Sequence, residues 1–336
     1  HTGTEAADTQ DKAEKDQVQP RLQIRWPAQL HRAFVVGIHS IDHACPTAGT
    51  SGGFALSAES HNVVGDEFGA IREDSWFMKI LLVGDIVGKG GQAAACRLVP
   101  KLRKEHRCCF CIANAENIAA GAGLTRAAVE NLHNHDVDVV TAGDHVWDKT
   151  DYVGHIDGLP KALRPANLNA RQPGRGYGIF KIPIGGTIAV INLLGHVFMR
   201  AQVTCPFATV DRILEEIGSR TTVIIVDMHA EATSEKIAMG RHLDGRVTAV
   251  FGTHTHVPTA DARVLPEGTA YITDLGMVGS RESILGRDIK DVVHRFRTGL
   301  PTRLRVVEDD IELHGAVIEL DVATGKALSI ESVSAV

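Results

Sequence analysis

The chain has 336 residues, of which 44% are hydrophobic, and its formal net charge is −6. This is the composition of an ordinary globular protein, and no stretch has the run of apolar residues that a transmembrane helix or a signal peptide needs. The negative charge argues against a broad surface for duplex nucleic acid, although a small phosphorylated substrate remains compatible with it. We therefore expect a soluble, cytoplasmic protein with no membrane partner.

Residues 1–77 differ from the rest of the chain. They begin at His1, mix polar residues with glycine, and apart from a short apolar piece show neither helical nor strand periodicity. Met78 is the first methionine, and strong α/β patterning follows it at once. We interpret 1–77 as a disordered extension or as translated sequence upstream of the true start, and 78–336 as the domain that carries the function.

Short apolar runs alternate with amphipathic segments from Lys79 onward, which predicts an α/β fold with mixed β-sheets packed against helices. Buried strands are predicted at 79–83, 108–114, 137–143, 223–227 and 247–252. Helices are predicted at about 92–105, at 124–135, and between the last two of these strands.

Local signals refine this pattern at three places. Thr125 is the expected N-cap of the second helix, because its hydroxyl can accept a hydrogen bond from a free backbone N–H of the first turn. Gly185 and Gly186 lie between two apolar runs and predict a β-hairpin. Segment 303–336 predicts antiparallel strands that close the sheet.

Six cysteines include one C-x-x-C pair, Cys108 and Cys111, a spacing that occurs in zinc and redox sites. No second pair completes a zinc set, and the pair lies inside the apolar run 108–114. We interpret both as buried strand residues, which fits a reducing compartment.

The predicted strands end in residues that commonly bind metals. Ligands in α/β sheets bind beyond the carboxyl ends of strands, so these residues are expected to share one site. In chain order they are Asp85, Glu116 with Asn117, Asp144 with His145, His229, and His254 with His256. Each has an ordinary explanation when taken singly, such as a helix cap, but five coincidences at one sheet edge favour a joint site.

The pair His254 and His256 is the most specific local pattern, since residues i and i+2 of an extended segment project to the same side. Mixed carboxylate and imidazole ligands suit manganese, iron, cobalt or zinc, whereas calcium prefers oxygen alone. A bridging carboxylate holds two such ions roughly 3.5–4 Å apart, the separation used in two-metal hydrolysis. The sequence therefore predicts a two-metal phosphoesterase site, with iron or manganese preferred over zinc or cobalt.

The glycine-rich segment 84–91 does not fit a phosphate-binding P-loop. It has three residues rather than four between Gly84 and Gly88, and neither Ser nor Thr follows Lys89. We expect its glycines to let the chain turn sharply and bring Asp85 to the metals.

At these residues the sequence resembles the calcineurin-like metallophosphoesterases, and within them the YmdB-type 2′,3′-cyclic-nucleotide phosphodiesterases. The resemblance covers nearly all of 78–336. It is carried by GDIVG at 84–88, AEN at 115–117, GDHVWDK at 143–149, RPAN at 164–167, HAEATSEK at 229–236, GTHTHVPTAD at 252–261 and AYITDLGM at 270–277. It implies the calcineurin-like fold, a dinuclear metal site at the carboxyl ends of strands, and opening of a small cyclic nucleotide to a 3′-nucleotide.

The resemblance also implies a role for each site residue. One metal would be held by Asp85 and His256, the other by Asp144, His229 and His254, with Glu116 bridging the two. Asn117 would bind phosphate beside the bridge, and His145 would act on the leaving oxygen of the substrate, with Asp148 as a candidate to orient it.

The chain departs from the family at one position, because the family usually has Gly-Asn-His where this sequence has Gly143-Asp144-His145. An aspartate adds negative charge, which should tighten metal binding and reduce Lewis acidity. Two other functions therefore stay open: hydrolysis of another phosphoester, and a metal-bound regulatory protein whose site is slow. In either case we expect a homo-oligomer.

Overall fold

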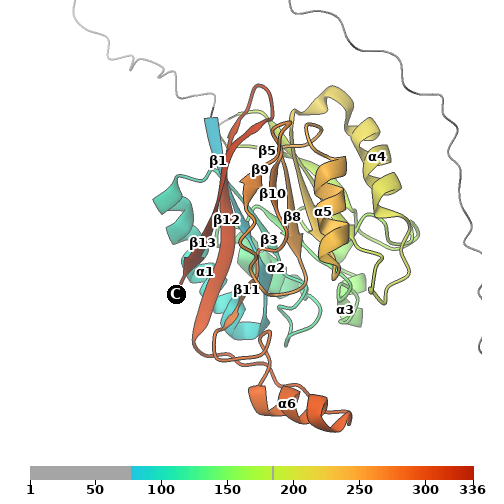
Figure 1. Ribbon diagram of the computed structural model, residues 1–336, viewed down its shortest axis with the longest axis vertical. Helices are drawn as coiled ribbons and strands as arrows, with labels where there is room; N and C mark the ends of the chain where they lie inside the picture. The colour runs from blue at the N-terminus through green and yellow to red at the C-terminus, as the bar shows by residue number, and fades with distance from the viewer. Residues whose placement is uncertain (1–76, 184) are drawn as a thin grey trace, which may run out of the picture. The chain divides into compact units, whose positions relative to one another are not determined.

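The computed structural model describes residues 77–183 and 185–336, so the predicted extension at 1–77 lies outside the described residues apart from Phe77. Within this part of the chain, two mixed β-sheets pack face to face, and helices cover their outer faces (Figure 1). The predicted fold class, an α/β fold with mixed sheets packed against helices, is confirmed.

The first sheet has the strand order β2-β11-β12-β1-β3-β4, and β13 pairs with β12. Its strands are β1 (Phe77–Val83), β2 (Asp85–Ile86), β3 (Phe110–Asn114), β4 (Val139–Thr141), β11 (Met277–Ser280), β12 (Ile311–Asp321) and β13 (Ala327–Ala335). β1, β3 and β4 run parallel, so their carboxyl ends point to the same edge. β12 runs antiparallel to β1, β11 and β13, as predicted for the C-terminal segment.

The second sheet has the strand order β5-β6-β7-β8-β10-β9. Its strands are β5 (Tyr177–Lys181), β6 (Thr187–Leu194), β7 (Val223–His229), β8 (Ala249–Thr253), β9 (Arg263–Val264) and β10 (Ala270–Ile272). β6, β7, β8 and β10 are parallel. β5 and β6 form the predicted hairpin, and both glycines of its turn, Gly185 and Gly186, have positive φ.

The helices lie on the outer faces of the sheets or connect their strands. They are α1 (Gly88–His106), α2 (Arg126–His133), α3 (Thr150–Val153), α4 (Pro206–Ile217), α5 (Thr233–His242) and α6 (Ile289–Thr298), with short 3-10 turns at Ile156–Gly158 and Gly218–Arg220. Thr125 caps α2 as predicted, because its hydroxyl accepts a hydrogen bond from the backbone N–H of Ala128. No helix among the described residues has the length and apolar character needed to cross a membrane.

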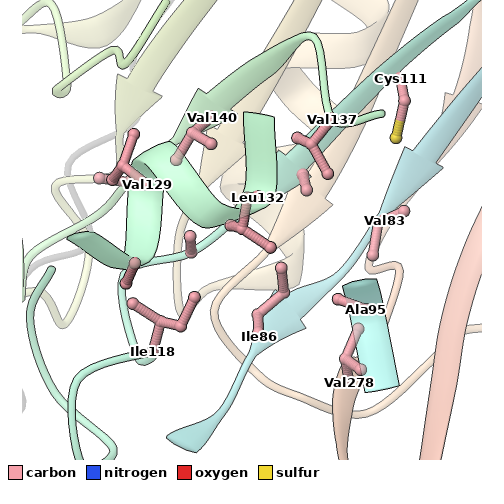
Figure 2. Packing of buried hydrophobic residues seen from close by; sticks show 14 of the residues in the cluster. Val83, Ile86, Ala95, Cys111, Ile118, Val129, Leu132, Val137, Val140 and Val278 are labelled. Atoms are coloured by element: carbon pink, nitrogen blue, oxygen red, sulfur yellow. The ribbon is translucent and has the colours of Figure 1, made fainter. Parts of the chain in front are cut away.

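The core is divided into layers because side chains alternate along each strand. On β1, Ile80 and Leu82 pack between the two sheets, whereas Leu81 and Val83 pack toward α1 and α2. Figure 2 shows the second of these layers, with Leu132 of α2 near Val83 and Ile86. A third layer joins the outer face of the second sheet to α4 and α5.

Both cysteines of the C-x-x-C pair are buried, with Cys111 on β3 and Cys108 just before it. Burial raises the pKa of the Cys111 thiol well above its ordinary value and that of Cys108 to about 11. The predicted burial of both thiols is confirmed, but only Cys111 is a strand residue, because β3 begins at Phe110.

Candidate metal centre

The structure brings the predicted ligand-type residues of both sheets to one place, at the carboxyl ends of the parallel strands. Three of them belong to the first sheet or follow its strands, and three end or follow strands of the second sheet. They are Asp85, Glu116 and Asp144 from the first sheet, and His229, His254 and His256 from the second. The candidate metal site therefore lies between the two sheets, at the edge where these strands end.

Three other donors gather around Nε2 of His229. This atom lies 3.1 Å from Oε1 of Glu116, 3.4 Å from Oδ1 of Asp144 and 3.1 Å from Nδ1 of His254. One ligand atom from each of these four residues lies within 4.8 Å of the other three. Donors spaced in this way can surround a single ion, since ligand atoms lie roughly 2 Å from a transition metal.

A second group lies beside the first. Nε2 of His256 is 3.8 Å from Oδ1 of Asp85 and 3.1 Å from Nδ2 of Asn117. The same Asn117 amide is 3.2 Å from Oε1 of Glu116. Glu116 therefore lies between the two groups, at the position that a bridging carboxylate would occupy.

The carboxylates in these groups favour a positive charge at this place, which a proton on His229 or a bound ion can supply. Burial disfavours the charged form of His229, but the carboxylates of Glu116 and Asp144 outweigh it and raise the pKa of His229 well above its ordinary value. Burial and the charge on His229 lower the pKa of His254 to about 4, so its imidazole is neutral, the form that binds metals. Among the described residues, Oδ1 of Asp85 and Oδ1 of Asp144 are buried and receive no hydrogen bond. The residues present thus fit a metal centre.

Two residues orient the imidazole of His229 through its Nδ1 atom, which faces away from the candidate metal position. Its Nδ1 lies 2.9 Å from Oγ1 of Thr253, and this hydroxyl donates to Oδ1 of Asp227 at 2.7 Å. If Nδ1 carries the proton, the lone pair of Nε2 faces the candidate metal position. Asp227 and Thr253 were not predicted as site residues, although a carboxylate at the end of the apolar run 223–227 was a visible signal.

The backbone at the histidine pair differs from the prediction. β8 ends at Thr253, and both His254 (φ 98°) and His256 (φ 64°) lie in the left-handed region, so the extended geometry expected for 254–256 is wrong. Such a conformation costs roughly 1–3 kcal/mol at a residue with a side chain. The turn is held because the backbone N–H of His254 donates to Oδ2 of Asp85 at 3.0 Å.

A buried ion pair supports the same turn. Nζ of Lys236 lies 2.6 Å from Oδ2 of Asp274, and both side chains are buried. Asp274 also accepts hydrogen bonds from the backbone N–H of Thr255 at 3.1 Å and of Gly276 at 2.8 Å. Lys236 and Asp274 lie in two of the motifs quoted above, but the sequence assigned neither a role.

Replacing Lys236 by methionine is expected to lower the free energy of unfolding by about 3–5 kcal/mol, because Asp274 would be left buried without its partner. Urea unfolding of metal-free protein measures this change. Lys290→Met, at an exposed position on α6, is the matched control and should shift the free energy by less than about 0.5 kcal/mol. Equal effects of the two substitutions would contradict the supporting role of the pair.

Gly143 allows Asp144 to enter the site. A Cβ atom at residue 143 would lie 2.1 Å from Nε2 of His229 and 2.3 Å from Oε2 of Glu116, so any larger side chain would displace one of these two groups. The glycine of the Gly-Asp-His motif is therefore required by the close approach of this chain to the centre.

His145 lies at the edge of the centre and is half-exposed. Its backbone N–H donates to Oε2 of Glu116 at 3.2 Å, and its Nδ1 lies 2.8 Å from Oδ2 of Asp148. His145 also lines a cavity of about 430 Å³, together with Glu116, Asn117, His254 and others. A molecule in this cavity could therefore contact both the imidazole and the metal centre.

Comparisons with known proteins agree over the described domain. A family model described as "YmdB-like protein" matches residues 81–333. The chain is 45% identical over 256 residues to the 2′,3′-cyclic-nucleotide 2′-phosphodiesterase of Bacillus subtilis strain 168, which covers 76% of this chain and 96% of that protein.

Two solved structures are also similar. A hypothetical protein from Thermus thermophilus has a TM-score of 0.72 and 36% identity, over 77% of this chain and 99% of its own. A novel phosphatase from Mycoplasma pneumoniae has a TM-score of 0.73 and 33% identity, over 77% of this chain and 93% of its own. The similarity in sequence and in fold therefore extends over nearly the whole length of these relatives.

Proposed function

This chain belongs to the YmdB-like protein family, and from that premise we propose that it opens 2′,3′-cyclic nucleotides to 3′-nucleotides at a two-metal centre. It is an enzyme that acts on phosphoesters, with the α/β architecture of metallophosphoesterases. The observation that carries the proposal is the position of Glu116 between two groups of donors, next to a cavity that His145 also lines.

Each candidate ligand has a place in this proposal. Asp85 and His256 would hold one ion, Asp144, His229 and His254 would hold the other, and Glu116 would contribute its carboxylate to both. Iron or manganese is the proposed pair, with zinc or cobalt as alternatives. Bound ions at these positions supply Lewis acidity toward the phosphoryl oxygens and lower the pKa of water.

Two side chains of the cavity act on the substrate itself, and a third side chain orients one of them. The Nδ2 amide of Asn117 donates to a phosphoryl oxygen, and His145 gives a proton to the 2′ oxygen when its bond to phosphorus breaks. Asp148 holds Nδ1 of His145, which leaves Nε2 directed at the leaving group. A hydroxide adds to phosphorus from the side opposite the 2′ oxygen, the bond from phosphorus to that oxygen breaks, and the phosphate stays on the 3′ oxygen.

The proposal is tested with the full chain, 2′,3′-cyclic AMP and added manganese or iron, with the product identified by chromatography. Turnover to 3′-AMP is expected, and metal content is measured on the same sample. A protein that binds two ions but leaves 2′,3′-cyclic AMP intact would overturn the proposal, and a panel of other phosphoesters would then identify the substrate class. Cytoplasmic location and self-association belong to the same proposal and are tested by cell fractionation and light scattering.

Asp144 supports a second candidate function, that of a metal-bound regulator with slow turnover. Its carboxylate lies 3.4 Å from Nε2 of His229, and its negative charge would reduce the Lewis acidity of a metal bound there. Asp144→Asn keeps the oxygen donor and removes the charge. We expect kcat on the cyclic nucleotide to rise roughly 3- to 10-fold, which corresponds to about 1 kcal/mol of barrier, with weaker metal retention on dialysis. An unchanged or lower kcat would show that Asp144 does not slow the site.

A further inference from the structure

The cavity next to the metal centre has two unlike walls. One wall consists of the polar residues already described, including Asn117 and His145. The other wall comes from the segment that contains α6, which stands off from the sheets at the bottom of Figure 1. Its side chains are mainly apolar: Ile284, Leu285, Val292, Phe296 and Leu304, with Arg287 and Arg295 beside them. A ligand of matching chemistry would have a phosphate end and a flat, weakly polar end.

The apolar wall contacts the candidate metal centre through the backbone of Leu285. The backbone carbonyl of Leu285 lies 3.2 Å from Nδ1 of His256, so this contact also orients a candidate metal ligand. Asp288 caps α6 by accepting from the backbone N–H of Asp291. Arg305 then ties the returning chain to Asp291 through two side-chain contacts of 2.8 Å. α6 is therefore anchored at its N-terminal turn by contacts that do not involve Phe296.

Phe296 is the prominent exposed side chain of this wall, with 79% of its surface accessible. Large aromatic side chains are mostly buried, so an accessible ring that lines a cavity is available to pack against a ligand. We propose that the ring of Phe296 stacks on the base of the substrate nucleotide, so that α6 is the nucleoside-recognition element of the site. This inference rests on the proposed function, because it assumes that the phosphate end of the ligand meets the metal centre.

Stacking explains the composition of the wall. Every nucleobase has a π-face, so an aromatic platform binds bases with little dependence on sequence, whereas specific reading of a base needs polar groups at its edges. The wall offers apolar contacts and two arginines, Arg287 and Arg295, of which Arg287 is already used by the backbone carbonyl of Gly121. Activity on all four 2′,3′-cyclic nucleotides follows from this arrangement.

The test compares a substrate that has a base with one that lacks it. Phe296→Ala in the full chain with manganese is expected to raise KM for 2′,3′-cyclic AMP roughly 10-fold, as the loss of one stacking contact predicts. Its kcat/KM for glycerol 1,2-cyclic phosphate, which has the same strained ester and no base, should not change. Phe296→Trp should retain the wild-type KM, and Val293→Ala, at an exposed position of α6 outside the cavity lining, is the matched control.

A binding experiment separates this inference from the proposed function. Calorimetric titration with 3′-AMP should show a roughly 10-fold weaker Kd for Phe296→Ala, and this readout does not need turnover. If the wild type hydrolyses neither cyclic ester, the proposed function fails, yet the shift in Kd still supports the nucleoside contact. An unchanged Kd, or equal losses on both esters, would overturn the inference. If Phe296→Ala lost activity equally on both esters and also had a different molar mass from the wild type in light scattering, Phe296 would be assigned to a contact between copies of the chain.

Discussion

Replacing Glu116 by alanine is expected to remove metal from both positions and to lower kcat on 2′,3′-cyclic AMP by about three orders of magnitude. The carboxylate is buried, approaches Nε2 of His229 at 3.1 Å, and lies next to the Asn117 amide of the second group. Losing the metal-derived stabilisation of several kcal/mol corresponds to a rate loss of roughly 10³-fold. Metal content by mass spectrometry and single-turnover rates measure the two effects on one preparation.

Two further variants sharpen this experiment. Glu116→Gln keeps the shape of the side chain and removes its charge, so it should lose metal without a change in fold by circular dichroism. Glu130→Ala removes a half-exposed carboxylate that pairs with Arg126 on α2, and it should retain both ions and full activity. Two tightly held ions in Glu116→Ala would show that this residue does not bridge them.

Replacing His145 by alanine is expected to lower kcat on 2′,3′-cyclic AMP by about 10²- to 10⁴-fold while both metals remain bound. The imidazole lines the cavity, and Asp148 fixes its Nδ1, so proton transfer to the leaving oxygen is its proposed task. An ester with a p-nitrophenolate leaving group needs much less protonation. The variant should therefore lose less activity on that ester, and steady-state rates on both substrates measure the difference.

The chain offers a close control for this variant. His155 is also half-exposed, with 38% of its side chain accessible against 39% for His145, and it lies 3.5 Å from a carboxylate, that of Asp151. His155→Ala should leave both rates unchanged. Equal losses of His145→Ala on the two esters, or loss of metal from it, would assign His145 a structural role instead.

The position of the candidate site could be predicted from the sequence because it depends on a local rule. Each apolar run marks a strand, and its last residues lie at the carboxyl edge where parallel strands end. Glu116 and His229 are brought within hydrogen-bond distance although they are far apart in the chain. The rule needs no knowledge of which strands are neighbours.

Other features depend on pairings that no local pattern contains. β1 pairs with β12, so that Ile80 lies opposite Ile318, and periodicity alone does not assign strands to two separate sheets. The ion pair of Lys236 and Asp274 arises only because α5 packs on β8, next to the chain that follows β10. The left-handed backbone at His254 likewise depends on a distant contact, the hydrogen bond to Asp85, because residues with a side chain seldom adopt positive φ.

The candidate ligands come from two different sheets, so bound metal ions would also affect the stability of the protein. Asp85, Glu116 and Asp144 belong to one layer, and the three histidines belong to the other. Ions bound between them would join the two sheets, in addition to the apolar side chains packed between the sheets and hydrogen bonds such as the one from Thr141 to Asp227. Binding to the folded chain alone adds its free energy to that of folding. The metal concentration would then affect the free energy needed to separate the two sheets at this edge. A chelator would favour local unfolding there first.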